Sequence, residues 1–370
     1  MRLKDYLIFK KIKNKTFANL LKISPVSLSR YLNGDRFPEK EILIKIYNLT
    51  EGLVTPNDFC LRDEKNYEIN ENEEGELNKF HKNILSGSRK YLGKAITLIE
   101  SSREKDQIIS EKLLELFKGN DKSIRIGITG VPGVGKSTFI ESFGMKLIKK
   151  GFKVAVLAVD PSSRFSGGSI LGDKTRMEKL SVNKNAFIRP SPSSGHLGGV
   201  AKRTSESILC LEEAGFNIIF IETMGVGQAE TEVYDMVDIF LVLLLPAGGD
   251  ELQGIKKGII EMADLIIVNK ADGNLKKSAY LTMQEYKNAQ SLISKSRKDL
   301  LPGVLSCSSI EESGLDEIWS FIERFFNKCK KNKSFYETRK TQKVNAIWRN
   351  LNTQIDDYIA NDVKLKNFTK

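Results

Sequence analysis

Hydrophobic residues in the central part of the chain occur in short continuous runs, and most of the runs end in a polar residue. Such runs are typical of strands that are buried on both faces of a parallel sheet. They predict strands at residues 124–128, 154–160, 217–223, 239–245, 265–270 and 304–309. Helical patterns separate the runs, so we expect an α/β domain over residues 121–326, with a mostly parallel sheet flanked by helices.

Residues 1–62 carry a different pattern, in which apolar residues recur at helical spacing in four short segments. Thr16 and Ser24 are placed to cap helices, and Gly34 is placed to end one. Short helices with three-residue connections are typical of a helix-turn-helix, so we expect a separate all-α unit of this kind.

The stretch from Phe17 to Pro38 resembles the helix-turn-helix proteins of the Cro/repressor class. The resemblance implies that residues 24–32 form a recognition helix. Its residues nearest to DNA bases would be Val26, Ser27, Ser29 and Arg30. The lysines that would meet phosphates are Lys10, Lys11, Lys13 and Lys15. A helical bundle that binds a protein, or that only extends the α/β domain, fits the same pattern.

Three further segments complete the expected organisation. Residues 63–76 are acidic and lack periodicity, which indicates a flexible linker. Residues 77–120 show two amphipathic helical patterns that would pack on the outside of the α/β domain. Residues 327–370 are lysine-rich and form a C-terminal helical arm. Its apolar stripe would be Ile347, Trp348, Leu351, Ile355 and Tyr358, packed either on its own domain or on a partner.

The clearest chemical motif follows the first predicted strand. It reads Gly-x-x-x-x-Gly-Lys-Ser, begins at Gly130, ends at Ser137 and leads into a helix. The loop amides and the helix N-terminus would surround a phosphate, Lys136 would reach the outer phosphates, and Ser137 would hold Mg²⁺. The predicted phosphate-side residues are Gly130, Val131, Pro132, Gly133, Val134, Gly135, Lys136, Ser137 and Thr138.

A second motif, Asn269-Lys270-Ala271-Asp272, follows the predicted strand at 265–270. A carboxylate at this place accepts hydrogen bonds from the ring N–H and the exocyclic amine of guanine. Opposite adenine it would stay unpaired, at a cost of ~1–3 kcal/mol, so we expect GTP rather than ATP. The loop at 307–310 would offer backbone N–H groups to the base. The predicted base-side residues are Asn269, Lys270, Asp272, Ser308, Ser309 and Ile310.

Three acidic residues lie at or near the ends of predicted strands. Asp160 and Glu222 end two of the strands, and Asp173 lies in the glycine-rich loop between them. With Ser137 they suit a hard cation that keeps several waters, so we predict a Mg²⁺ site made of Ser137, Asp160, Asp173 and Glu222, with Lys136 and Glu222 as the catalytic residues. Capping of the following helix is the alternative role of each acid.

Composition narrows the function classes. The longest apolar run, 239–245, is far shorter than the ~20 residues that a membrane helix needs, and the N-terminus shows no secretory signal, so we expect a cytoplasmic protein. Four cysteines without a C-x-x-C pair and two histidines argue against a zinc site. The net charge of +11 fits an acidic partner or solvated lysines.

Six segments together resemble the MeaB/ArgK-type GTPases, and the resemblance runs from residue 77 to the C-terminus. The segments are 130–141, 158–177, 193–201, 221–230, 246–259 and 268–273. The resemblance implies a dimerising GTPase chaperone that assists cofactor loading and protection of an adenosylcobalamin-dependent acyl-CoA mutase of the methylmalonyl-CoA mutase type. It also implies a first switch region with Asp160 and Asp173, a second at 222–230, and a third at 248–257 that senses the mutase.

Two features depart from that family pattern: the N-terminal unit, and Ser308-Ser309 where the family has Ser-Ala. Since no residue is an obvious arginine finger, we expect slow hydrolysis until the mutase orders the switch loops. Two alternatives stay open. In the first, the chain is a DNA-binding regulator that uses the GTPase domain as a sensor. In the second, it is a metallochaperone GTPase, which the scarcity of histidine and cysteine disfavours.

Overall fold

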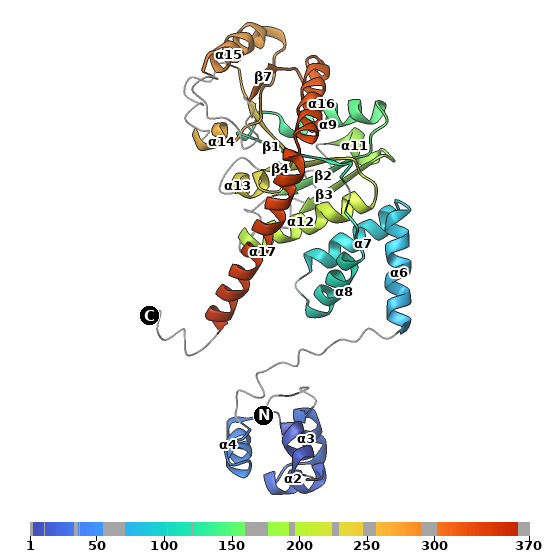
Figure 1. Cartoon of the computed structure of the whole chain (residues 1–370), viewed down its shortest axis with the longest axis vertical. Coiled ribbons are helices and arrows are strands. Elements are labelled where there is room, and N and C mark those ends of the chain that lie inside the picture. Colours follow the sequence, from blue (N-terminus) through green and yellow to red (C-terminus); the bar gives the residue numbers. More distant parts are fainter. Residues whose placement is uncertain are drawn as a thin grey trace. The chain divides into compact units, whose positions relative to one another are not determined.

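The computed structural model divides into two compact units, Met1–Glu74 and Gly75–Lys370 (Figure 1). The residues that it describes are 3–10, 12–32, 36, 38–54, 71–101, 103–119, 121–159, 177–191, 197–223, 229–246, 257–289 and 302–361. No helix among these residues is long and apolar enough to cross a membrane.

The N-terminal unit contains the four predicted helices. They are α1 (Leu3–Phe9), α2 (Asn14–Leu21), α3 (Pro25–Leu32) and α4 (Lys40–Leu49). Apolar side chains from these helices enclose a small core around Phe17, Leu21 and Leu28. The Ser24 hydroxyl accepts a hydrogen bond from the Ser27 amide at 3.0 Å, which confirms Ser24 as a cap. The prediction for Thr16 is wrong, because α2 begins two residues earlier, at Asn14.

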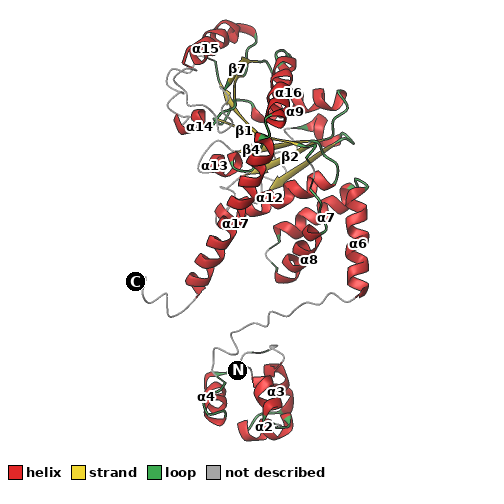
Figure 2. Cartoon of the chain, in the orientation of Figure 1, coloured by secondary structure: helices red, strands yellow, loops and turns green. Residues whose placement is uncertain are grey.

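The second unit is built on a seven-stranded sheet in which every pair of neighbours is parallel (Figure 2). The strand order is β3-β2-β4-β1-β5-β6-β7. The strands are β1 (Ile124–Gly130), β2 (Val154–Val159), β3 (Ala186–Ser191), β4 (Ile218–Thr223), β5 (Ile239–Leu244), β6 (Leu265–Val268) and β7 (Gly303–Ser306). The α/β fold with a parallel sheet is therefore confirmed.

Alternate residues of each strand enter two different cores, because successive side chains point to opposite faces. On one face, β4 contributes Ile219 and Ile221 to a core shared with α7 (Arg89–Glu100), α12 (Leu197–Glu213), α13 (Ala229–Tyr234) and α15 (Lys276–Ala289). On the other face, Ile218 and Phe220 pack with α9 (Lys136–Lys149), α11 (Glu178–Val182) and α16 (Leu315–Lys331). Both faces are covered, which explains the continuous apolar runs.

Three sequence-based predictions need correction. The region 77–120 was predicted to hold two helices, but α6 (Glu71–Leu85) precedes α7 and α8 (Glu104–Glu115). Since α6 begins at Glu71, the linker prediction is wrong for residues 71–76. Strand β3 was missed, because Arg189 and Pro190 interrupt its apolar run. The helices α7 and α8 do pack against the sheet domain, through Leu92, Ile96 and Leu113.

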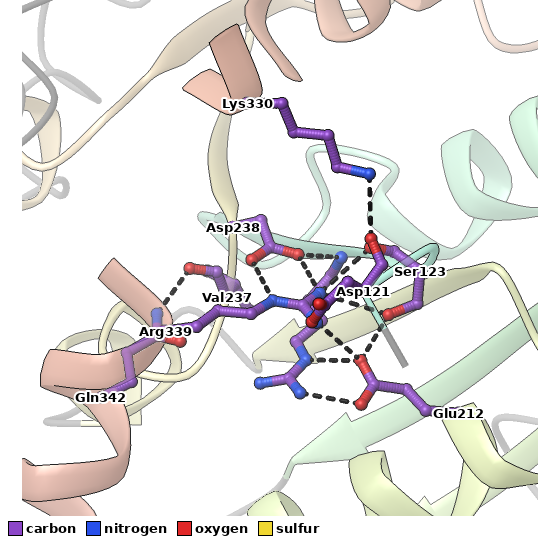
Figure 3. A network of polar contacts seen from close by, with 9 residues as sticks. Asp121, Ser123, Glu212, Val237, Asp238, Lys330, Arg339 and Gln342 are labelled. Atoms are coloured by element: carbon purple, nitrogen blue, oxygen red, sulfur yellow. Dashed lines mark hydrogen bonds and ion pairs between the residues drawn. The ribbon is translucent and has the colours of Figure 1, made fainter. Parts of the chain in front are cut away.

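The shorter elements lie around the sheet, and the long α17 (Ser334–Asn361) follows α16. Helix α14 spans Lys257–Glu261, and a 3₁₀ turn, η3, spans Gly273–Leu275. Arg339 of α17 is buried and donates to both carboxylate oxygens of Asp238, at 2.9 and 2.8 Å. Figure 3 shows its guanidinium lying between Asp238, Ser123 and Glu212. This network fixes the first turns of α17 to the amino-terminal ends of β1 and β5.

Candidate nucleotide-binding site

The predicted phosphate loop lies between the end of β1 and the start of α9. Gly130 and Gly135 have φ angles of +151° and +93°, which side chains rarely adopt. A Cβ at Gly130 would lie 2.6 Å from the Leu243 carbonyl oxygen, and one at Gly135 would lie 2.9 Å from the Asn269 Nδ2 atom. The two glycines therefore let the loop approach β5 and the residue that follows β6.

Lys136 stands at the first position of α9, with only 8% of its surface exposed. Its ammonium group donates to the carbonyl oxygens of Gly130, at 2.7 Å, and Val131, at 3.3 Å. Burial lowers the pKa of this lysine, and the carboxylates of Glu222 and Glu230 oppose that shift. The cation is thus held inside the loop, where a phosphate oxygen would replace a carbonyl as its partner.

Ser137 and Glu222 are brought together from α9 and the end of β4. The Ser137 hydroxyl donates to Glu222 Oε1 at 3.1 Å, and Glu222 is 7% exposed. These two hard oxygen donors fit Mg²⁺, which uses one or two protein ligands and keeps several waters. Asp160 and Asp173, the other two predicted ligands, lie outside the described residues. Among the described residues no group of three or more His, Cys, Asp or Glu side chains could hold a metal.

Asn269, in the loop after β6, joins that loop to the phosphate loop and to the loop after β7. It is 1% exposed, and its Nδ2 atom donates to the Val134 carbonyl oxygen at 2.9 Å. Its Oδ1 atom accepts from the Ser309 hydroxyl at 2.8 Å. The asparagine of the second motif therefore ties the phosphate loop to the loop after β7. Lys270, next to it, has a φ angle of +56° and is half-buried.

Asp272 is oriented by the loop after β7. Its Oδ2 atom accepts from the Ser308 hydroxyl at 2.5 Å, and that hydroxyl in turn accepts from the Glu311 amide at 3.0 Å. The Ser308 amide itself donates to the Ser313 carbonyl oxygen at 3.1 Å. The protein thus fixes one carboxylate oxygen of Asp272. Ile310, at the tip of the same loop as Ser308, is 78% exposed.

The other phosphate-side residues differ in exposure. Pro132, Gly133 and Thr138 are exposed, Val131 is half-buried, and Val134 is buried. The exposed residues form the outer rim of the loop, and Val134 anchors it in the core beneath the sheet edge. The structure thus brings together, at the carboxyl ends of β1, β4, β6 and β7, every predicted nucleotide-site residue that it describes.

The four residues predicted to lie nearest to DNA bases, Val26, Ser27, Ser29 and Arg30, all lie on α3, and Val26 is 63% exposed. Ser29 and Arg30 are exposed. Ser27 is half-buried, and its hydroxyl lies 2.9 Å from that of Ser24. The Ser27 side chain is therefore part of the cap.

Sequence reasoning did not single out two features of this region. The hydroxyls of Thr129 and Thr223 are hydrogen-bonded at 2.8 Å and join β1 to β4 just before the phosphate loop. Glu230 is buried on α13 and acts electrostatically on Lys136. In the sequence, Glu230 has the ordinary pattern of an acidic residue in the first turn of a helix, so only the structure distinguishes it.

Comparisons with known proteins agree with this geometry. Residues 92–364 match the model of the family described as methylmalonyl Co-A mutase-associated GTPase MeaB. The chain is 45% identical over 279 residues to GTPase ArgK of Escherichia coli, which covers 75% of this chain and 84% of that protein. It is 44% identical over 291 residues to the mouse protein named methylmalonic aciduria type A homolog, mitochondrial, covering 76% and 70% of the two chains.

A solved structure gives the same result for the fold. The crystal structure of a protein named LAO/AO transport system kinase superposes with a TM-score of 0.67 at 36% identity, over 78% of this chain and 88% of that one. The family match extends from α7 to α17 and includes the whole nucleotide site. The chain therefore belongs to the family of methylmalonyl Co-A mutase-associated GTPases called MeaB, and it is a GTPase.

Proposed function

We propose that this GTPase assists an adenosylcobalamin-dependent acyl-CoA mutase of the methylmalonyl-CoA mutase type, acting as a chaperone in cofactor loading and protection. The observation that carries the proposal is the family match over residues 92–364, since the family is described by its association with this mutase. The names of the relatives in mouse and in Caenorhabditis elegans, both called methylmalonic aciduria type A homologs, support the same partner.

At the site, we propose a division of labour between two groups of residues. Lys136 and the loop amides stabilise the charge that develops on the phosphates, and Ser137 and Glu222 hold Mg²⁺, with Asp160 and Asp173 as further ligands. Bound Mg²⁺ would supply additional positive charge beside the terminal phosphates. Asp272 recognises guanine through both carboxylate oxygens, because the Oδ2 atom that accepts from Ser308 keeps a second lone pair.

The test is GTP hydrolysis by the purified chain, with and without the mutase loaded with adenosylcobalamin. We expect a mutase-dependent rise in turnover, because the partner orders the site. The Lys136→Ala variant should lose both basal and stimulated turnover. If no mutase of this type changes the rate while basal hydrolysis is intact, the chaperone proposal is wrong and the GTPase assignment stands.

We propose that the distal part of α17 forms a homodimer contact. Four apolar side chains at helical spacing, Val344, Ile347, Trp348 and Leu351, are between 43% and 62% exposed. A second copy would cover this stripe, as the family resemblance implies. The prediction is a particle of twice 41.7 kDa by light scattering, which Trp348→Ser and Ile347→Ser together should reduce to the monomer. A wild-type monomer at micromolar concentration would contradict it.

DNA binding by the N-terminal unit is a second candidate function. The observation that favours it is the surface of α3, where Ser29 and Arg30 are exposed at the end of a helix that Ser24 caps. Exposed lysines at positions 10, 13 and 15 precede it and would meet phosphates. Titration with genomic DNA fragments should show salt-dependent binding that Arg30→Ala weakens and Lys136→Ala leaves unchanged. Unchanged binding by Arg30→Ala, or loss of binding in Lys136→Ala, would assign DNA binding to another surface.

A further inference from the structure

Glu230 on α13 is a buried carboxylate at the end of the second switch region that the family resemblance implies, and no catalytic or metal-binding role above uses it. It is 2% exposed, and neither of its carboxylate oxygens has a hydrogen-bond partner among the residues that the structure describes. A charged carboxylate away from water is unfavourable unless donors surround it. A residue that costs stability in this way, at the edge of an active site, is expected to have a role in function.

The path of the chain places Glu230 at the nucleotide end of α13. Helix α13 connects β4 to the parallel strand β5, so it runs from the carboxyl edge of the sheet back to the amino edge. Val233 packs over the middle of β1, since a Cβ at Gly127 would lie 3.2 Å from its Cγ1 atom. Glu230 precedes Val233 by one helical turn and therefore lies toward the end of β1, where Gly130 begins the phosphate loop.

The charges around Glu230 restrict what it binds. Its carboxylate and that of Glu222 oppose the lowering of the Lys136 pKa that burial causes, so Glu230 acts on the ammonium group. That ammonium group donates to two loop carbonyls and has a third N–H. The Glu230 carboxylate repels phosphate oxygens and needs a hydrogen-bond donor as its partner. A water molecule next to the terminal phosphate provides one.

Helix α13 is also held firmly from its other end. Arg349 of α17 lies 3.4 Å from the Asp235 carboxylate, and Gln342 donates to the Val237 carbonyl oxygen at 2.8 Å. Figure 3 shows Gln342 and Arg339 of α17 meeting Val237 and Asp238, just after α13. A carboxylate on a fixed helix suits the positioning of a reacting group.

We propose that Glu230 is the water-positioning residue of this GTPase, whose carboxylate accepts a hydrogen bond from the water that attacks the terminal phosphate. In this step the water oxygen bonds to the terminal phosphorus, and the bond from that phosphorus to the bridging oxygen of GDP breaks. The water proton leaves with the released phosphate. The inference rests on GTP hydrolysis alone and is independent of any mutase.

The test compares Glu230→Gln with Glu232→Gln, the same change two residues along the same helix. Single-turnover GTP hydrolysis, binding of a fluorescent GTP analogue and thermal unfolding are measured without a mutase. For Glu230→Gln we expect about a 10²-fold lower rate, an analogue Kd within about threefold of wild type, and a higher Tm because a buried charge is removed. Glu232→Gln should hydrolyse GTP at the wild-type rate.

Three results would overturn the proposal. A wild-type rate for Glu230→Gln would show that the carboxylate does not touch the reaction. A parallel loss of rate, analogue binding and Tm would show a structural role. Recovery of the Glu230→Gln rate at high Mg²⁺ concentration would assign the carboxylate to a metal-bound water instead of the attacking one.

Discussion

Buried charged side chains are paired differently at the two edges of the central sheet. At the amino edge, Arg339 and Arg125 pair with Asp238 and Glu212 at distances of 2.8 to 3.5 Å. The two positive and two negative groups balance, and the Asp238 pKa is lowered by Arg339 and then Arg125 against the opposing effect of burial. At the carboxyl edge, the charges of Lys136, Glu222 and Glu230 do not balance, and within the described part of the chain both carboxylate oxygens of Glu230 lack a hydrogen-bond partner.

This difference separates stability from function. A network whose members satisfy one another fixes α17 to the domain and needs nothing from outside. A buried carboxylate such as Glu230, without a hydrogen-bond partner among the described residues, is typical of a functional site. The amino edge is therefore expected to control unfolding, and the carboxyl edge to control turnover.

The largest expected effect is on stability, from Arg339→Ala. Removing this guanidinium leaves the buried carboxylates of Asp238 and Glu212 without their shared partner, which typically costs about 3–5 kcal/mol of unfolding free energy. Urea denaturation measures this loss. GTP affinity, measured below the unfolding transition, should change little.

Arg349→Ala is the matched control for that variant. Arg349 also lies on α17, but its side chain and that of Asp235 are 31% and 42% exposed at 3.4 Å separation. Exposed pairs contribute at most ~1 kcal/mol. Equal losses in the two variants would mean that the buried network does not hold α17 in place.

The next effect is on turnover, from Lys136→Ala. Loss of a preorganised charge at the phosphates should lower the rate of GTP hydrolysis by about 10²–10³-fold. The free energy of unfolding should fall less than in Arg339→Ala, because the hydrogen bonds that the structure describes for the ammonium go to two loop carbonyls of its own motif, although its charge also offsets those of Glu222 and Glu230. Stopped-flow phosphate release and urea denaturation give the two values. A large stability loss without a rate loss would reverse the assignment of the two edges.

The smallest effect concerns Glu232, on the helix between the two edges. Burial raises its pKa to about 7 from 4.5; Arg349 opposes the rise and Asp235 adds to it. Between these two values the folded chain binds a proton that the unfolded chain has released. This contribution to stability is thus present at low pH and is lost as the pH rises through 7.

Urea denaturation at pH 5.5 and pH 7.5 tests this sign. Because Glu232 is partly exposed, the wild type should lose only about 1 kcal/mol more than Glu232→Gln between the two values. An identical change in both proteins would show that Glu232 titrates normally.

The sequence predicted six of the seven strands, because burial on both faces makes each strand a continuous apolar run. It also placed the nucleotide motifs, since their chemistry depends on local spacing. It did not predict the pairing of Arg339 with Asp238, which are 101 residues apart, or the burial of Glu230. Such properties depend on contacts between distant segments. The prediction missed strand β3 because of its local sequence, since Arg189-Pro190 resembles the end of a strand.

The most direct test of the account is hydrolysis of GTP and ATP by the purified chain under identical Mg²⁺ concentrations. The carboxylate of Asp272, oriented by Ser308, should leave ATP turnover below about 1% of GTP turnover at subsaturating concentrations. Asp272→Asn should lower the GTP value without improving the ATP value. Equal turnover of the two nucleotides would contradict the assignment of this edge of the sheet as a guanine-specific site.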